Sequence, residues 1–152
     1  VKWGNFITTL DWAYQLSNVL FTNLSVSYNK YKSNINSTYE SISNENGQED
    51  KYNFSYDFIS SVEDVSIRNN YNYYLNSYNS ICFGVEYTHH SYAPEVTSIV
   101  TNDNSVITSP YSVTNKKYGN EIISYLEDEI NFNKLCITTG LHLDNYNVEG
   151  TN

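Results

Sequence analysis

The chain has 152 residues, a formal net charge of -9 and an aromatic content of 16%. Its length suits a single domain. The acidic balance argues against nucleic acid as a partner, because phosphates bind basic patches. So many aromatic side chains exclude a disordered chain, and no apolar run comes near the roughly 18 residues that a membrane helix needs.

Two runs near the start of the chain, residues 6–14 and 20–31, alternate between larger apolar side chains and small or polar ones. Alternation predicts β-strands, because successive side chains of a strand point to opposite faces. The short segment 15–18 between them predicts a turn, so the two runs form a hairpin. Residues two apart in a strand lie on the same face, and we say that they share a parity. One parity comprises Phe6, Thr8, Leu10, Trp12 and Tyr14 in the first strand, and Leu20, Thr22, Leu24, Val26 and Tyr28 in the second.

Two longer stretches lack this alternation. Residues 32–57 are rich in Asn, Ser and Glu, and residues 91–118 contain both prolines and a middle rich in Ser, Thr and Asn. Clusters of such residues are typical of connections exposed to water. We therefore expect a long solvated loop in each of these two places.

The clearest strand is residues 79–90, paired through a turn at 75–78 with residues 62–74. Its apolar parity carries Ile81, Phe83, Val85 and Tyr87, and its other parity carries Ser80, Cys82, Gly84, Glu86 and Thr88. Bulky aromatic groups on one face and small polar groups on the other are typical of a transmembrane barrel strand, with lipid outside and a wet or plugged lumen inside.

The last hairpin joins residues 121–132 to residues 135–147 through a turn at 131–134. The run Glu127-Asp128-Glu129 interrupts the apolar parity of the first of these strands, which makes it the least regular of the six. The second strand alternates cleanly. Its apolar parity holds Leu135, Ile137, Thr139, Leu141 and Leu143, and its polar parity holds Cys136, Thr138, Gly140, His142 and Asp144.

The hairpins predict an all-β, antiparallel, up-and-down transmembrane β-barrel segment of about six strands in three hairpins, with short turns at one end and long loops at the other. The strands reach the roughly 9–11 residues of a tilted spanning strand, whereas strands of soluble proteins are nearer 5–6 residues. Known bacterial barrels begin at about eight strands, so we expect part of a larger barrel, or a small one that lacks a hairpin. A soluble secreted β-sandwich that binds carbohydrate remains the alternative, and a small adhesin or anchor barrel a further one.

Few residues suggest a chemical site. His89 and His90 are adjacent, so they point to opposite faces and cannot bind one metal ion without a bend. The acidic run at 127–129 has no glycine-containing calcium loop beside it. Asp11, Glu86 and Asp144 share the polar parity, where a catalytic pair is conceivable, but lumen-facing strands carry charges routinely. We expect no catalytic residue, no metal and no cofactor.

Cysteine and tyrosine give two further expectations. Cys82 and Cys136 could pair only if their strands were neighbours, so we expect free thiols. Aromatic residues toward the strand ends suit girdles at the two membrane interfaces. Tyrosines in the two expected loops are the candidate ligand contacts, namely Tyr39, Tyr52, Tyr56, Tyr92 and Tyr111.

An ordered series of short segments adds a resemblance. The series comprises WGN at 3–5, LFTNLSVSYNKY at 20–31, NYYLNSYN at 72–79, FGVEYTHHSYAP at 83–94, YLEDEI at 125–130 and GLH at 140–142. It resembles the barrel of TonB-dependent outer-membrane receptors of Bacteroidetes-type bacteria, over nearly the whole chain except the two expected loops. The turn at 75–78 departs from these receptors in lacking a proline.

The resemblance implies a bacterial outer-membrane protein with a barrel of about 22 strands. Residues 1–152 would then be a partial barrel domain, without the N-terminal plug domain. It also implies uptake of a scarce nutrient, driven by TonB through the plug. The implied partners are outer-membrane lipid, TonB and a surface lipoprotein. A glycan, a peptide and a metal chelate all stay open as ligands.

Overall fold

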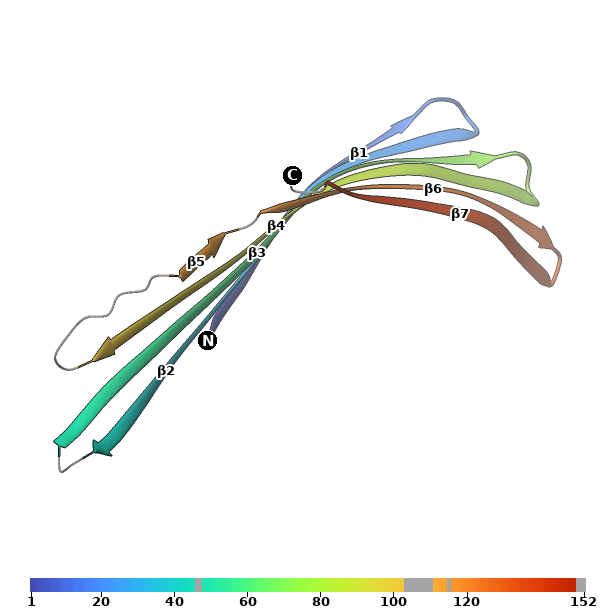
Figure 1. Cartoon of the computed structure of the whole chain (residues 1–152). Helices are drawn as coiled ribbons and strands as arrows, with labels where there is room; N and C mark the ends of the chain where they lie inside the picture. Colours follow the sequence, from blue (N-terminus) through green and yellow to red (C-terminus); the bar gives the residue numbers. More distant parts are fainter. Residues whose placement is uncertain (46–47, 103–110, 115, 150–152) are drawn as a thin grey trace. The chain divides into compact units, whose positions relative to one another are not determined.

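A computed structural model describes residues 1–45, 48–102, 111–114 and 116–149, and every regular element in them is a β-strand (Figure 1). The strands are β1 (Lys2–Gln15), β2 (Leu20–Glu45), β3 (Gln48–Tyr74), β4 (Asn79–Asn102), β5 (Tyr111–Thr114), β6 (Lys117–Phe132) and β7 (Leu135–Glu149). They form one sheet in the order β1-β2-β3-β4-β6-β7, and the short β5 pairs with β4. In the described chain, no helix is long and apolar enough to cross a membrane.

The three expected short turns are all present. In the first, the backbone N–H of Leu16 donates to the carbonyl of Leu20 at 2.9 Å. In the second, the side chain of Asn76 accepts a hydrogen bond from the backbone N–H of Tyr78 at 2.8 Å, a common use of Asn in turns. In the third, Asn133 has a φ of 46°, a left-handed conformation that Asn tolerates better than most residues. The predicted antiparallel, up-and-down organisation in three hairpins is confirmed.

The prediction of long loops at residues 32–57 and 91–118 is wrong for most of these residues. β2 and β3 continue to Glu45 and from Gln48, so only a short connection separates them, and β4 continues to Asn102. β5 pairs with this extension of β4 in an antiparallel register from Glu95–Thr114 to Ser98–Tyr111.

The prediction failed because alternation of apolar and polar residues reflects the media on the two faces of a strand. It does not show whether the backbone is paired with another strand. A strand with water on both faces needs no apolar parity, while its N–H and C=O groups still find partners in the next strand. Polar cross-strand contacts replace apolar ones there. For example, the Asn36 amide on β2 donates to a carboxylate oxygen of Asp57 on β3.

The chain divides into two compact units. Unit 1 comprises Val1–Phe6, Lys30–Val62 and Tyr92–Lys116, and unit 2 comprises Ile7–Asn29, Glu63–Ser91 and Lys117–Asn152. Unit 2 thus contains the three short turns and the alternating stretches of sequence. Unit 1 contains most of the two stretches in which the alternation is lost.

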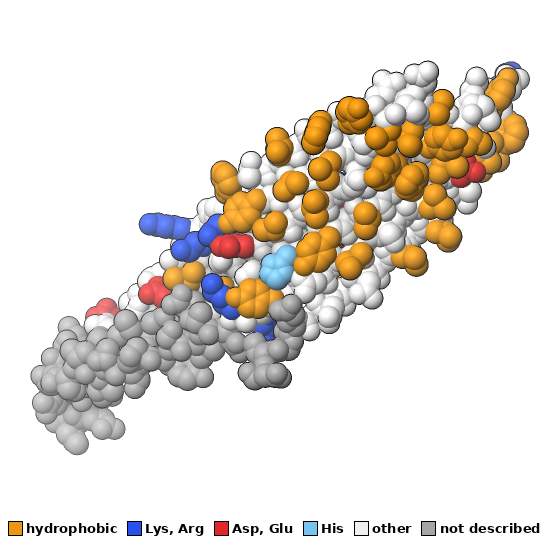
Figure 2. Space-filling model, turned by 90° about the horizontal axis from the view of Figure 1, so that it is seen from above, with side chains coloured by type: hydrophobic (Ala, Val, Ile, Leu, Met, Phe, Trp, Pro, Cys, Tyr) orange, Lys and Arg blue, Asp and Glu red, His pale blue; other side chains and the backbone are white. Residues whose placement is uncertain are grey.

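In unit 2, one face of the sheet, here called the apolar face, carries large side chains exposed to the surroundings. Leu10, Leu141 and Leu143 have exposed fractions of 74%, 73% and 71%, and no hydrophobic side chain among the described residues is buried. The rings of Tyr71 and Phe83 stack on this face with their centroids 4.9 Å apart. Figure 2 shows hydrophobic side chains crowded on the side of the molecule that it presents. Bare apolar surface of this extent marks a face that another apolar medium covers.

The opposite side of unit 2, here called the polar face, is held by hydrogen bonds between strands. The hydroxyl of Ser25 donates to Asp11, the hydroxyls of Ser27 and Ser66 bond to each other, and Asn29 donates to Asp64. Side chains that bond directly across strands lie on one face of the sheet. These pairs therefore confirm the parities assigned to β1, β2 and β3 from the sequence.

We predict that arginine on the two faces of β7 has very different effects on stability. Leu141 lies opposite Leu126 in the register with β6, and His142 lies opposite Tyr125. Leu141→Arg should cost about 2–4 kcal/mol if this position is near the bilayer midplane, whereas His142→Arg should cost less than about 1 kcal/mol. Urea titration of the full-length receptor folding into lipid vesicles measures both. Equal losses would show that the two faces are assigned wrongly.

Candidate functional site

Charged side chains of unit 2 gather on the polar face, on β3, β4 and β6. The central group is His90 on β4. Its Nδ1 lies 2.8 Å from Asp64 Oδ1 on β3, and its Nε2 lies 3.3 Å from Glu121 Oε2 on β6. Both ring nitrogens of His90 therefore lie close to a carboxylate, one on each neighbouring strand. These contacts link the neighbouring strands β3, β4 and β6 at facing positions.

Further polar and aromatic groups complete this cluster. Asn29 on β2 donates to the second carboxylate oxygen of Asp64 at 3.3 Å. The ring of Tyr146 on β7 lies 5.7 Å from that of His90. All three members of the His90 contacts are about one-quarter exposed, with side-chain fractions of 28%, 24% and 25%. The cluster is therefore sheltered but still reachable from the polar side of the sheet.

A second ion pair lies on the same face. Arg68 on β3 donates from Nη2 and Nε to Glu86 Oε2 on β4, at 2.6 and 2.8 Å. The side chain of Arg68 is 49% exposed, so the pair contributes little to stability by itself. The pair borders an open hollow of about 470 Å³. The lining residues are Arg68, Cys82, Glu86, Ile123, Tyr125, Glu127 and His142.

Glycine makes room for one long reach across this face. Tyr125 on β6 passes over Gly84 on β4, and its hydroxyl donates to Asn70 Oδ1 on β3 at 2.9 Å. A Cβ at Gly84 would lie only 2.6 Å from Asn70 Oδ1 and 2.8 Å from Tyr125 Cε1. The absence of a side chain at Gly84 thus allows a tyrosine to span two strand spacings and link β6 to β3.

The same arrangement recurs once more between β7 and β6. Tyr146 reaches over Gly119, where a Cβ would lie 2.6 Å from the tyrosine hydroxyl oxygen. Glycines in strands often mark such close approaches. Neither contact can be predicted from composition. The available signal in the sequence was Gly84 itself, a glycine on the polar parity of an otherwise regular strand, which indicates a close approach by another group.

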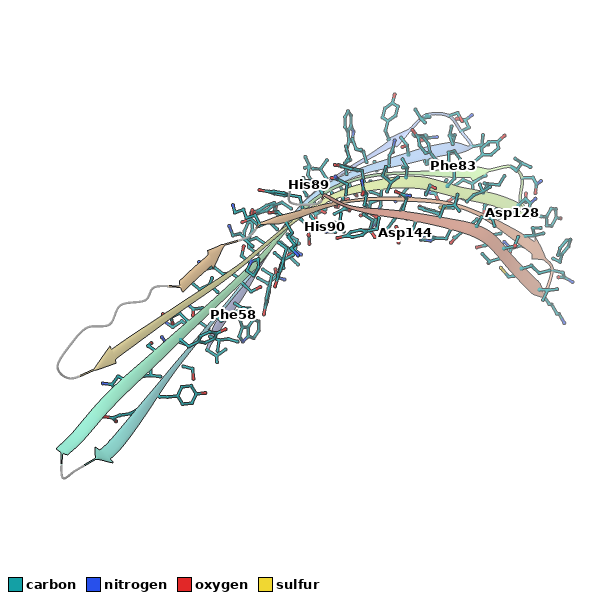
Figure 3. The ribbon with its side chains drawn as sticks, viewed as in Figure 1. Phe58, Phe83, His89, His90, Asp128 and Asp144 are labelled. Atoms are coloured by element: carbon teal, nitrogen blue, oxygen red, sulfur yellow. The ribbon has the colours of Figure 1, made fainter. Side chains whose placement is uncertain are left out.

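The two adjacent histidines lie on opposite faces, as predicted. His89 Nδ1 lies 2.8 Å from Asn120 Oδ1, and its ring stacks on Tyr118 at 5.8 Å. Figure 3 labels both histidines on β4, close to each other along the strand. Among the described residues, no three His, Cys, Asp or Glu side chains form a group suited to a metal ion.

The carboxylates considered as a catalytic pair lie on the expected strands but not together. Asp11 bonds to Ser25, and Glu86 bonds to Arg68. Asp144 lies opposite Ile123 in the register of β6 and β7. Because β1, β4 and β7 are separated by at least one other strand, about 4.8 Å per spacing, the three acids do not form one acid–base pair.

The acidic run at 127–129 is part of β6 and is divided between faces. Glu127 lines the hollow on the polar face, while Asp128 has the opposite parity and lies opposite Thr139. Figure 3 labels Asp128 toward the end of β6 that leads into the last turn. Carboxylates on opposite faces of one strand cannot bind the same ion.

The predicted ligand-contacting tyrosines belong to strands of unit 1, not to loops. Tyr39 lies on β2 and is 64% exposed, Tyr56 lies on β3, and Tyr92 lies on β4 and is 40% exposed. Among the described side chains, no hydrogen bond or ring contact joins these three. Tyr52 and Tyr111 lie outside the residues whose side chains the structure describes. Their role in binding a ligand stays a prediction.

The two cysteines lie on strands that are not neighbours. Cys82 is on β4, Cys136 is on β7, and β6 lies between these strands. Both thiols are free. The sulfur of Cys82 lies 3.9 Å from the hydroxyl oxygen of Tyr125, so this thiol belongs to the polar network described above.

A sheet that presents bare apolar side chains on one face and a hydrogen-bonded ionic network on the other is the wall of an outer-membrane β-barrel. Residues 1–152 match the family described as TonB dependent receptor-like, beta-barrel. The chain therefore belongs to this family, and it is part of a receptor and transporter of the bacterial outer membrane that works with TonB. No curated protein matches the chain.

This assignment leaves the soluble β-sandwich without support. A sandwich buries its apolar faces between two packed sheets. The described strands all belong to one sheet, and the large side chains of its apolar face remain exposed. The apolar face of unit 2 is accordingly the surface that contacts lipid, and the polar face lines the lumen.

We predict that Gly84→Val destabilises the receptor by about 1–3 kcal/mol, because the new side chain would displace both the ring of Tyr125 and the amide oxygen of Asn70. In a Tyr125→Ala background the same substitution should cost less, because only the contact with Asn70 remains, and this coupling is the specific result expected. Gly4→Val is the matched control, since a Cβ at Gly4 meets nothing within 4 Å. Urea unfolding of the four variants gives the energies. An equal cost of Gly84→Val with and without Tyr125 would contradict the proposed contact.

Proposed function

We propose that this segment is one section of a larger, plugged barrel that imports a scarce nutrient across the outer membrane. The observation that supports this most is the pair of unpaired edges. Within the described residues, β1 and β7 each have a single neighbour in the sheet. A strand edge in lipid leaves backbone groups without partners, at several kcal/mol each. Further strands on both sides would supply hydrogen-bond partners for these backbone groups.

The lumen-facing network supports the proposal of a plug. A barrel of about 22 strands is too wide for its own side chains to fill, so the lumen needs a separate domain. The polar face offers Arg68, whose side chain is half exposed, and the acids Glu127 and Asp144 as groups that a polar plug surface would pair with. Residues 1–152 would then be a partial barrel domain, with the plug domain elsewhere and TonB acting through the plug.

The ligand-binding role belongs, in this proposal, to the strands of unit 1. The exposed side chains of Tyr39 and Tyr92 present flat apolar rings with a polar tip, which suit a glycan, a peptide or a metal chelate alike. The proposed contacts are Tyr39, Tyr52, Tyr56, Tyr92 and Tyr111. The resemblance to receptors of Bacteroidetes-type bacteria supports a surface lipoprotein as the partner that delivers the ligand. The chain contributes binding and passage, with no catalytic step of its own.

We predict that a Tyr39→Ala/Tyr56→Ala/Tyr92→Ala variant of the full-length receptor needs about tenfold more nutrient for half-maximal growth. Lost ring contacts are worth about 0.5–1.5 kcal/mol each, so three of them at the weak end of this range together give about tenfold. The assay compares growth of a receptor-deficient strain, complemented with each variant, on a glycan, a peptide and a metal chelate as the limiting nutrient. Only the nutrient that needs the wild-type receptor is then titrated.

Tyr78→Ala is the matched control, because Tyr78 is 66% exposed in a short turn of unit 2. It should leave the growth curve unchanged. Immunoblots of outer membranes confirm equal amounts of receptor. If the triple variant and Tyr78→Ala behaved alike, the tyrosines of unit 1 would not be ligand contacts.

A further inference from the structure

Two hollows on the polar face of unit 2 share part of their walls. The first is the hollow of about 470 Å³ beside the Arg68–Glu86 ion pair. The second has a volume of about 280 Å³, and Cys82 and Glu127 line both hollows. The other residues that line the second hollow are Asn72, Tyr74, Ser80, Glu129 and Thr138. Because the two hollows share residues, they form one depression along β4 and β6, here called the lumen groove.

The lumen groove follows the direction of the strands. On β4 it extends from Ser80, close to the short turn at 75–78, to Glu86. This distance along a strand is about 20 Å. An extended peptide of about six residues has the same length. The groove is therefore long enough to hold a short peptide that lies parallel to the barrel wall.

The lumen groove has more negative than positive charge. The carboxylates that line it are Glu86, Glu127 and Glu129, and the guanidinium that lines it, that of Arg68, is already paired with Glu86. Glu127 and Glu129 are exposed, and Glu129 accepts a hydrogen bond from the neutral amide of Asn131 at 2.8 Å. Within the described part of the chain, no lysine or arginine forms an ion pair with either of these two acids. A ligand with positive charge would supply the missing partners.

The spacing of the two acids matches that of an extended peptide. Residues two apart in a strand share a face and are about 7 Å apart, so Glu127 and Glu129 lie one after the other along the groove. Alternate side chains of an extended peptide beside β6 have the same separation. Lysine or arginine at every second position would then face both acids. The rings of Tyr74 and Tyr125 line the same groove, and aromatic rings attract cations.

We propose that the lumen groove binds extended peptides with lysine or arginine at alternate positions as they pass along the barrel wall. This inference rests on the proposed uptake function and names its ligand class. The peptide would take the place of the plug surface that rests against Glu127. An anionic metal chelate would be repelled by the acids, and a neutral glycan would leave their charge uncompensated. Exposed ion pairs are weak, which suits a site that a ligand must also leave.

Cys82 is a native reporter for the lumen groove, because it lines both hollows and its thiol is free. The test uses the full-length receptor in phosphatidylcholine nanodiscs, with Cys136 and every cysteine outside residues 1–152 replaced by serine. A cationic reagent, trimethylammonioethyl methanethiosulfonate, and an anionic one, sulfonatoethyl methanethiosulfonate, modify the thiol. Mass spectrometry measures the rate of modification with each reagent.

The probes are three hexapeptides that alternate alanine with lysine, glutamine or glutamate, and maltohexaose as a neutral glycan. The lysine peptide should protect Cys82 from both reagents. The glutamine and glutamate peptides and maltohexaose should protect it only at concentrations at least tenfold higher. The difference follows from charge, because the peptides have the same length and backbone.

A pair of variants tests the role of the two acids. Glu127→Gln/Glu129→Gln should raise the concentration of lysine peptide that half-protects Cys82 by about tenfold, since each exposed ion pair contributes roughly threefold. The same variant should reduce the preference of Cys82 for the cationic over the anionic reagent. Asp128→Asn is the matched control, because it removes a carboxylate from the same strand on the opposite face. It should behave as the wild type does.

Equal protection by the lysine and glutamine peptides, or equal behaviour of the double variant and Asp128→Asn, would overturn the proposal. Protection by maltohexaose at the concentration of the lysine peptide would also overturn it and indicate a glycan site. So would a Cys82 thiol that reacts with neither reagent until urea unfolds the receptor, because the plug then fills the groove. If the double variant fails to fold, the comparison of peptides on the unsubstituted groove decides the question.

Failure of the uptake function would give a different result. Growth on every limiting nutrient would then be independent of the receptor. Protection of Cys82 needs neither TonB nor transport, so it can be present or absent whatever the growth assay shows.

Discussion

The structure depends on one constraint: in a bilayer, every backbone N–H and C=O must find its partner inside the protein. An antiparallel sheet meets this demand by pairing neighbouring strands, and only its edges remain open. The pairing then leaves the side chains of each strand free to face two different media. In unit 2, one medium receives Leu10, Leu141 and Leu143, which no other part of the described chain covers. The other receives the charges and amides.

The division between faces explains why this sheet has polar contacts where a soluble domain has a core. A shift of two residues keeps every apolar side chain of a strand toward lipid, so contact with lipid alone does not fix the register of adjacent strands. Specific contacts on the lumen side fix the register instead. His90 joins β3, β4 and β6 through two carboxylates, and Tyr125 crosses Gly84 to reach Asn70. A shift of one residue would move each of these groups to the other face.

The sequence predicts the architecture of unit 2 well, because lipid and lumen impose opposite demands on alternate residues. Ile81, Phe83 and Val85 on one parity were enough to identify a spanning strand. The extensions of β2, β3 and β4 were not predictable in this way, since water on both sides removes the alternation but not the backbone pairing. For the cluster around His90, the sequence predicts the face of the sheet but not the contacts. Parity puts Asp64 and His90 on the polar face, but their contact depends on the registers among three strands, which a single sequence does not fix.

The central claim is that the exposed apolar face of this segment is a lipid-contacting surface and not half of a missing core. Size-exclusion chromatography of residues 1–152 in buffer without detergent, followed by thermal melting, tests it most directly. The account predicts aggregation and no cooperative melt, because aromatic and aliphatic side chains and two unpaired strand edges would be exposed to water. A monodisperse monomer of 17.5 kDa with a cooperative melt would contradict it.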